Sequence, residues 1–291
     1  MKIRIRFSKQ GEMRFIGHLD FMRFFQKVIR RTGIDIRFSE GISPHMVMSF
    51  ASPLGVGVTS EGEYVDIEIN TPVATEEALV RLNACSVEDV RFLDFRAIPE
   101  GKGQKAMSLV AAADYEVGFL PGLEPDQTWT DQFMKFLEQG QIIVTREKKK
   151  ALKKAAGRKK RSKDKPEGNP DGSGNDEPGA ELTQTLDIRP LIYHAEALSR
   201  NPENDPFQAG CTGPFVRMRL SSGSAANLRP DLVMKTFTDW MGASDHPFAF
   251  RIHRLDLLCR KEDIYGPDCP ESAGTDPFIS LGDLGEKITL L

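Results

Sequence analysis

The first hundred residues alternate between strand-like and helix-like hydrophobic patterns. In the segment 2–7, apolar residues alternate with Lys and Arg, which is the period of a half-buried strand. Residues 18–31 place an apolar stripe at helical spacing, and Gly33 stands where a C-terminal cap belongs. The other elements predicted here are strands at 34–38 and 65–69, a short helix at 75–83 and a closing strand at 87–98.

The second half repeats this order of elements. We predict a strand at 114–120, a helix at 130–138 and a strand at 141–146. A hairpin of 182–195 with 214–220, a helix at 230–240 and a last strand at 250–258 follow. The simplest interpretation is an α+β protein of two tandem ferredoxin-like βαββαβ units with antiparallel sheets. We place the units at 1–105 and 106–291.

Two segments interrupt this pattern. A long loop is predicted at 39–62, rich in Gly, Pro and Ser but too apolar for a disordered linker, so it should fold back over the first unit. Residues 147–181 are low in apolar residues and change from basic to acidic, which predicts a disordered charged linker inside the second unit.

Charge is unevenly distributed along the chain. The formal net charge is −3, but residues 146–165 hold twelve Lys and Arg against two carboxylates, and residues 1–37 hold ten against three. No apolar run is long enough to cross a bilayer, so we expect a cytoplasmic protein without a membrane partner. The four cysteines are widely scattered, and the sequence predicts neither a metal site nor a cofactor.

Long stretches of the chain resemble a known bacterial family. They are IRFSKQGEMRFIGHLDFMRFFQKVIRRTGIDIRFSEG, PHMVMSFASPLGVGVTSEGEYVDIEI, LDIRPLI (186–192), NLRPDLV (227–233) and RIHRLDLL (251–258). They are similar to the radical SAM-associated, or radical SAM-linked, proteins of unknown function, a domain also found fused to the C-terminus of radical SAM enzymes. The resemblance implies a radical SAM enzyme as partner, because this chain has no CxxxCxxC motif of its own. Gly17 departs from the family pattern, which tends to have Ser there.

His18, Asp20 and His45 are the candidate catalytic residues. His18 and Asp20 share the first turn of the first predicted helix, and His45 lies in the loop that folds back toward it. Two histidines can act as acid and base in metal-independent RNA cleavage. The alternative, which the sequence favours, is that His18 satisfies backbone groups near the helix start and Asp20 faces the positive end of the helix dipole.

Two sets of basic residues are candidates for binding anions. The first set comprises four cations on the solvent side of the first helix and three loop residues beside them: Arg23, Lys27, Arg30, Arg31, Ser43, Pro44 and His45. Such a face can contact an RNA backbone, or it can be an ordinary solvated surface. The second set is a possible anion site in the second unit: Arg189, Arg229, Arg251, His253 and Arg254.

Three functions remain open at this point. The sequence favours a non-catalytic adaptor that binds RNA or a ribonucleoprotein and works with a radical SAM enzyme in tRNA or ribosome modification. The first alternative is a ribonuclease that uses His18 and His45. The second is a purely protein-binding module that docks on the radical SAM enzyme through the apolar loop.

Overall fold

The computed structural model describes residues 1–99, 104–147, 183–200, 213–243, 246, 248–266 and 274–290. The predicted linker at 147–181 lies outside the described residues, apart from its first position.

The first half of the chain contains two helices packed on strands. Its elements are β1 (Lys2–Lys9), the short 3-10 helix η1 (Gly11–Phe15), α1 (His18–Thr32), β2 (Met48–Phe50), β3 (Thr59–Glu68), α2 (Thr75–Ala84) and β4 (Phe92–Ile98). The predicted helix at 18–31 is confirmed, and it ends at Gly33, whose φ of 70° is the left-handed conformation that glycine adopts without strain.

The second half follows the predicted order with added short elements. Its elements are α3 (Ala106–Leu109), β5 (Val110–Phe119), α4 (Trp129–Leu137), β6 (Ile143–Glu147), β7 (Thr183–Asp187), η2 (Arg189–Leu191), β8 (Ile192–Arg200), β9 (Gly213–Ser221), α5 (Pro230–Trp240), β10 (Phe250–Arg260), α6 (Lys261–Tyr265), β11 (Phe278–Ser280), η5 (Leu281–Asp283) and β12 (Glu286–Lys287). Pro230 begins α5, where its missing N–H costs nothing.

One large sheet runs through both halves. Its strand order is β12-β4-β1-β3-β10-β5-β9-β8, with β2 paired to β3 and β11 paired to β10, while β6 and β7 form a separate pair. The pairs are antiparallel except that β10 runs parallel to β3, where His253 lies opposite Thr59 and Arg254 opposite Ser60. The mixed α+β class is therefore confirmed. Apart from β6 and β7, the described strands form one mostly antiparallel sheet that is continuous between the halves.

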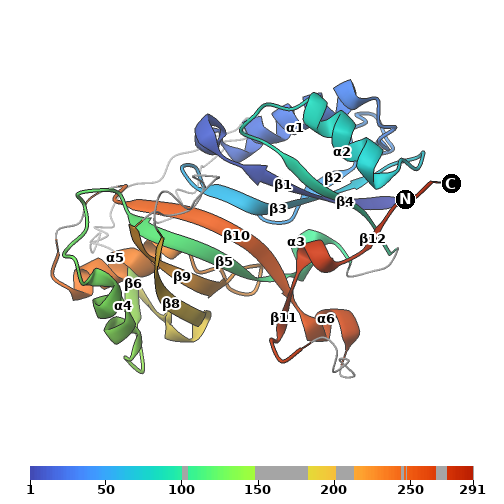
Figure 1. Ribbon diagram of the computed structural model, residues 1–291. Coiled ribbons are helices and arrows are strands. Elements are labelled where there is room, and N and C mark those ends of the chain that lie inside the picture. Colours follow the sequence, from blue (N-terminus) through green and yellow to red (C-terminus); the bar gives the residue numbers. More distant parts are fainter. Residues whose placement is uncertain are drawn as a thin grey trace, which may run out of the picture.

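The helices cover the two halves separately. Figure 1 shows α1 and α2 on the outer side of β1, β3 and β4, and α4 with α5 at the opposite end of the molecule. Most of the buried apolar residues belong either to a cluster under α1 and α2 or to a larger cluster built from α4, α5 and the strands beside them. Among the described residues, no helix combines the length and apolarity needed to span a membrane.

The structure corrects two predicted segments. The loop at 39–62 contains β2 and the first residues of β3, which begins at Thr59. Its Gly and Pro residues are turn signals, but pairing with β3 and β10 orders the chain between them. The predicted strand at 182–195 is two strands, β7 and β8, separated by η2.

Arg4 on the polar side of β1 is buried, although the alternation in sequence predicts that this side faces solvent. Arg4 is only 3% exposed, and its guanidinium binds the Asp66 carboxylate at 2.9 Å and the carbonyl of Gln104 at 2.8 Å. Because the chain at Gln104 packs over Arg4, this residue becomes part of the interior, while Lys2 and Arg6 on the same side of β1 are half-buried.

The end of the described chain returns to the first half. β12 pairs with β4, and the Thr75 hydroxyl accepts a hydrogen bond from the backbone N–H of Ile288 at 2.8 Å. Thr75 also donates its hydroxyl proton to the carbonyl of Phe95 at 2.7 Å. The last strand therefore covers an edge of the first half's sheet.

Candidate functional site

Helix α1 is held against the sheet by aromatic side chains. Phe21 and Phe25 are buried and contact the ring of Phe7 on β1, with centroid distances of 5.6 and 5.5 Å. Phe50 of β2 joins the same group, 5.5 Å from Phe25. Because the inner face of the helix is fixed in this way, its outer face is presented to solvent in a defined orientation.

The outer face of α1 carries the predicted cations. Arg23, Lys27, Arg30 and Arg31 are all exposed. Arg23 binds the Asp20 carboxylate at 2.9 Å, and both side chains are about 70% exposed. Among the described contacts, none pairs Lys27, Arg30 or Arg31 with a carboxylate. These three cations are therefore candidates to pair with an anionic partner.

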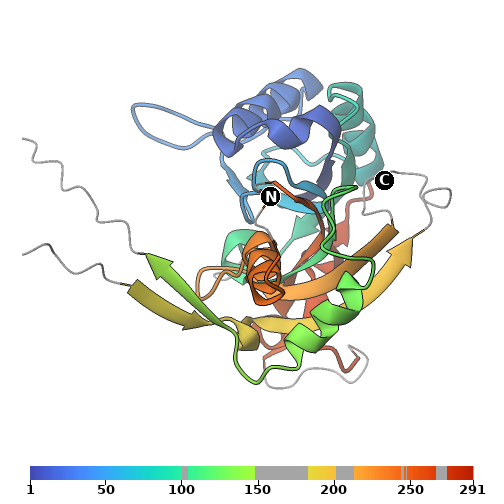
Figure 2. The same cartoon turned by 90° about the vertical axis from the view of Figure 1, so that its left-hand side faces the viewer.

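The loop that holds Ser43, Pro44 and His45 is a short hairpin. Phe38 pairs with Met46, and the N–H of Ser39 donates to the carbonyl of His45 at 2.8 Å. All three predicted residues are exposed, and Ile42 beside them is fully exposed. Figure 2 shows the loop after α1 projecting from the first half next to that helix.

The described contacts give His18, Asp20 and His45 different partners. The His18 ring lies edge-on to Phe50, with centroids 5.4 Å apart, while Nδ1 of His45 is 2.8 Å from the hydroxyl of Ser39. Asp20 is engaged with Arg23. No group of three or more His, Cys, Asp or Glu in the described part of the chain is placed to hold a metal ion.

The second-half anion candidates are likewise held by different partners. Arg189 donates to the carbonyls of Leu137 and Ile192, which fixes the chain at η2. Arg229 pairs with Asp231 at the start of α5. His253 and Arg254 are neighbours on β10, both buried. Arg251 is half-buried on the same strand.

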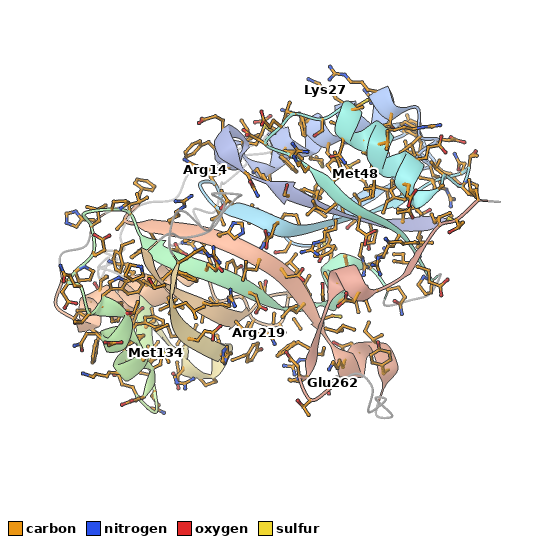
Figure 3. All side chains as sticks on the ribbon, viewed as in Figure 1. Arg14, Lys27, Met48, Met134, Arg219 and Glu262 are labelled. Atoms are coloured by element: carbon orange, nitrogen blue, oxygen red, sulfur yellow. The ribbon has the colours of Figure 1, made fainter. Side chains whose placement is uncertain are left out.

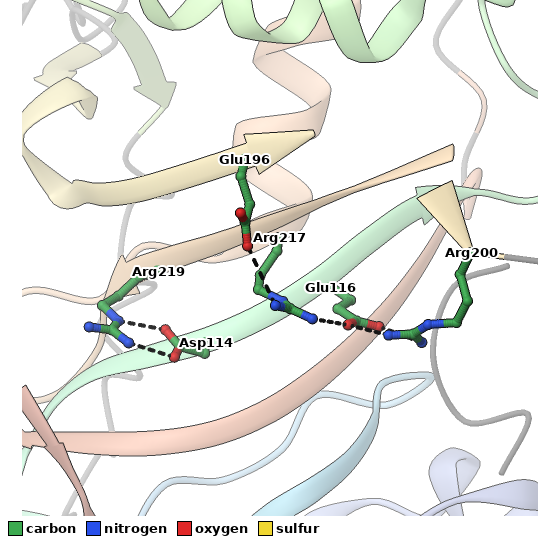
Figure 4. A network of polar contacts seen from close by, with 6 residues as sticks. All are labelled: Asp114, Glu116, Glu196, Arg200, Arg217 and Arg219. Atoms are coloured by element: carbon green, nitrogen blue, oxygen red, sulfur yellow. Dashed lines mark hydrogen bonds and ion pairs between the residues drawn. The ribbon is translucent and has the colours of Figure 1, made fainter. Parts of the chain in front are cut away.

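Three arginines on β8 and β9 are bound to carboxylates. Figure 4 shows Arg200 and Arg217 converging on Glu116 while Arg219 binds Asp114. Glu116 has a side chain only 1% exposed, and both its oxygens accept from Arg200, at 2.8 and 3.1 Å. These three cations are already engaged in ion pairs and are not free to pair with an added anion.

A group of ionisable residues lies where the two halves join. His253 Nδ1 is 2.9 Å from the Thr59 hydroxyl, and its Nε2 is 3.9 Å from a carboxylate oxygen of Glu61. Burial raises the pKa of Glu61, and the nearby Glu116 and Asp256 raise it further, whereas Arg6 and Arg200 oppose the shift. The charged form of the Glu61 carboxylate is therefore less favourable in the folded protein than in the unfolded chain.

Replacing Glu61 with glutamine is expected to raise the thermal midpoint at pH 7 by about 1–2 °C. A carboxyl whose folded pKa is raised stabilises the fold below its unfolded pKa, and that contribution is lost as the pH rises through the folded pKa. The variant and the unmodified protein should therefore differ at pH 7 and converge below about pH 4, as measured by thermal unfolding followed by circular dichroism. Glu40→Gln is the matched control because the Glu40 side chain is 94% exposed. This variant should leave the thermal midpoint unchanged both at pH 7 and below about pH 4. An unchanged midpoint for Glu61→Gln at pH 7 would contradict the inference that folding disfavours the charged form of the Glu61 carboxylate.

Phe15 is an exposed aromatic residue beside α1 that the sequence does not single out as a site residue. Phe15 ends η1 and is 52% exposed, and Ile16 and Leu19 beside it are also exposed. The sequence does contain a signal for their exposure. Phe15 and Ile16 are large apolar residues that fit neither the strand pattern before them nor the helix pattern after Gly17. Their position next to the basic face of α1 extends the candidate site.

Comparison with known proteins identifies the family. The family model described as an uncharacterized protein conserved in bacteria (DUF2344) matches residues 2–162, more than half of the chain. The chain belongs to this family. No curated protein matches it.

The DUF2344 match divides the candidate residues. The range 2–162 includes η1, α1 and the hairpin at 38–46, whereas the five anion candidates between Arg189 and Arg254 lie beyond it. The outer face of α1 is thus within the part of the chain that defines the family.

Proposed function

We propose that this DUF2344 protein is a non-catalytic adaptor that binds RNA or a ribonucleoprotein through the outer face of α1. The observation that carries the proposal is the contrast between two sets of cations. Arg4, Arg217, Arg219 and Arg254 are bound to carboxylates, whereas Lys27, Arg30 and Arg31 are exposed with no carboxylate among their described contacts. Phosphate contacts need cations that are free to pair.

The proposed partner of the adaptor is a radical SAM enzyme that modifies tRNA or the ribosome. The argument for it is the resemblance to radical SAM-linked proteins, together with the lack of a CxxxCxxC motif in this chain. In this proposal the exposed hairpin residues Ser43, Pro44 and His45 contribute to recognition beside the helix.

We also propose that the scaffold consists of two tandem ferredoxin-like units, 1–105 and 106–291. The order β4-β1-β3-β2 in the first half has its counterpart in β10-β5-β9-β8 in the second, which supports the proposal. In each half, two helices connect strands of one antiparallel group. The two groups meet at the parallel pair of β3 and β10.

Charge reversal on α1 is expected to weaken RNA binding at least tenfold. In the double variant Lys27→Glu, Arg31→Glu two phosphate contacts are lost, so the dependence of affinity on salt should also become shallower, by about 0.7 per contact for a single strand. Binding of a labelled RNA, first identified by ultraviolet crosslinking in the protein's own cells, measures both effects by fluorescence polarisation over a range of salt concentrations.

The matched control is Lys105→Glu, Lys135→Glu, which changes the net charge equally at exposed positions away from α1. It should retain affinity, and both double variants should unfold at nearly the temperature of the unmodified protein. Equal RNA affinity in the α1 variant and the control variant would count against the proposed site.

A further inference from the structure

The start of the basic face contains an exposed aromatic ring stacked on an arginine. The guanidinium carbon of Arg14 lies 4.6 Å from the centroid of the Phe15 ring. Phe15 is 52% exposed, and η1 contains no buried residue. The ring is therefore not part of the hydrophobic core, although it is large enough to bury substantial apolar area in a complex.

The segment that carries this ring is held firmly. The Asp89 carboxylate accepts hydrogen bonds from the N–H groups of Glu12 and Met13, at 2.8 and 3.3 Å. The buried Lys9 ammonium donates to the carbonyl of Ile16 at 2.7 Å. On the other side, the N–H of Gly57 donates to the carbonyl of Arg14 at 2.9 Å. Because the backbone that carries the ring is fixed in this way, it loses little conformational freedom when a ligand stacks on the ring.

The same segment leads directly into the cations of α1. Leu19, Arg23, Lys27 and Arg31 follow one another at intervals of four residues, so they form a row along the helix with a rise of about 6 Å per step. Figure 3 shows Arg14 at the end of the first half where α1 begins, and Lys27 farther along α1 with its side chain directed away from the sheet. Residues 14–31 hold five Lys and Arg against a single carboxylate, Asp20.

We propose that Phe15, backed by Arg14, is a stacking platform for an unpaired base of single-stranded RNA whose backbone follows the row of cations on α1. This inference rests on the proposed function and specifies its ligand. Bases in a duplex are stacked on each other, so an exposed protein ring reaches only an unpaired base. A ring next to a row of cations is the combination that binds single strands, through stacking and phosphate contacts together.

The test distinguishes stacking by the aromatic face of Phe15 from the apolar contact that any large side chain would make. Phe15→Leu keeps an apolar side chain but removes the aromatic face, whereas Phe15→Tyr keeps the face. Since stacking of one base contributes about 1–3 kcal/mol, Phe15→Leu should weaken binding of a single-stranded oligoribonucleotide at least fivefold. Phe15→Tyr should bind like the unmodified protein. The same oligonucleotide annealed to its complement should bind Phe15→Leu and the unmodified protein equally.

A spectroscopic readout reports the contact directly. Phe15→Trp adds an exposed indole, whose emission should be quenched when the single-stranded oligonucleotide is added, compared with the same titration of the unmodified protein, whose tryptophans are Trp129 and Trp240. Thermal unfolding of each variant should match that of the unmodified protein because Phe15 lies outside the core.

The outcomes distinguish this inference from the proposed function. Equal single-strand affinity for Phe15→Leu, combined with loss of binding in Lys27→Glu, Arg31→Glu, would overturn the stacking platform and leave the RNA-binding face of α1 in place. Equal affinity in both variants would overturn both. Loss of single-strand affinity in Phe15→Leu with duplex affinity unchanged is the result that the platform predicts.

Discussion

Replacing Arg254 with methionine is expected to lower the free energy of unfolding by about 3–5 kcal/mol, because the change leaves a buried carboxylate without its partner. The Arg254 guanidinium donates to both oxygens of Glu63, at 2.8 and 2.7 Å, and also to the carbonyl of Ser52 at 3.2 Å. The two side chains are only 3% and 5% exposed, so solvent cannot replace the lost contacts. Urea-induced unfolding followed by circular dichroism measures the change.

The double variant Glu63→Leu, Arg254→Met provides the control for this pair. Removing both charges leaves no uncompensated group, so the double variant should be more stable than Arg254→Met alone, although it has one more substitution. If Arg254→Met were destabilised by less than about 1 kcal/mol, the pair would not hold the halves together as its burial indicates.

Replacing Gly62 with alanine is expected to destabilise the fold by about 2–3 kcal/mol and to lower the thermal midpoint by about 5–10 °C. A Cβ at this position would lie 2.3 Å from the carbonyl oxygen of Leu255 and 2.5 Å from Cα of Asp256, both backbone atoms of β10. Because β3 and β10 are paired nearby, neither backbone can move without disturbing the junction.

Gly55→Ala is the matched control for Gly62→Ala. The nearest atom to a Cβ at Gly55 is in the flexible Val58 side chain, 3.4 Å away, which is an ordinary contact. Differential scanning calorimetry should show an unchanged midpoint for Gly55→Ala. If Gly62→Ala also left the midpoint unchanged, β3 and β10 would be able to separate locally at little cost in free energy.

Local patterns predicted the helices and strands with strong periodicity. The apolar stripe of α1 and its glycine cap are visible in sequence, and so is Pro230 at the start of α5. The beginning of β3 was not predicted because it contains buried polar residues, Ser60 and Glu63, in place of an apolar alternation. The pairing of β3 with β10 joins residues almost two hundred positions apart, and no local pattern encodes it.

Only the part of the candidate site that follows from the helical repeat of α1 could be predicted from the sequence. The positions of Lys27 and Arg31 on the outer face of α1 follow from that period. The same reasoning wrongly placed Arg4 in solvent, because alternation identifies the apolar face of a strand but not what covers the polar face. Whether a cation is already paired depends on contacts across the fold, as for Arg254 with Glu63.

The return of β12 to β4 has a consequence for synthesis on the ribosome. Roughly 190 residues separate these strands. Because the ribosome adds about 5–20 residues per second, β12 is synthesised about 10–40 s after β4. During that interval the nascent first half has a bare sheet edge, which is the kind of surface on which chains pair wrongly with one another. A chaperone that shields strand edges would have its greatest effect on the yield of this protein within that window.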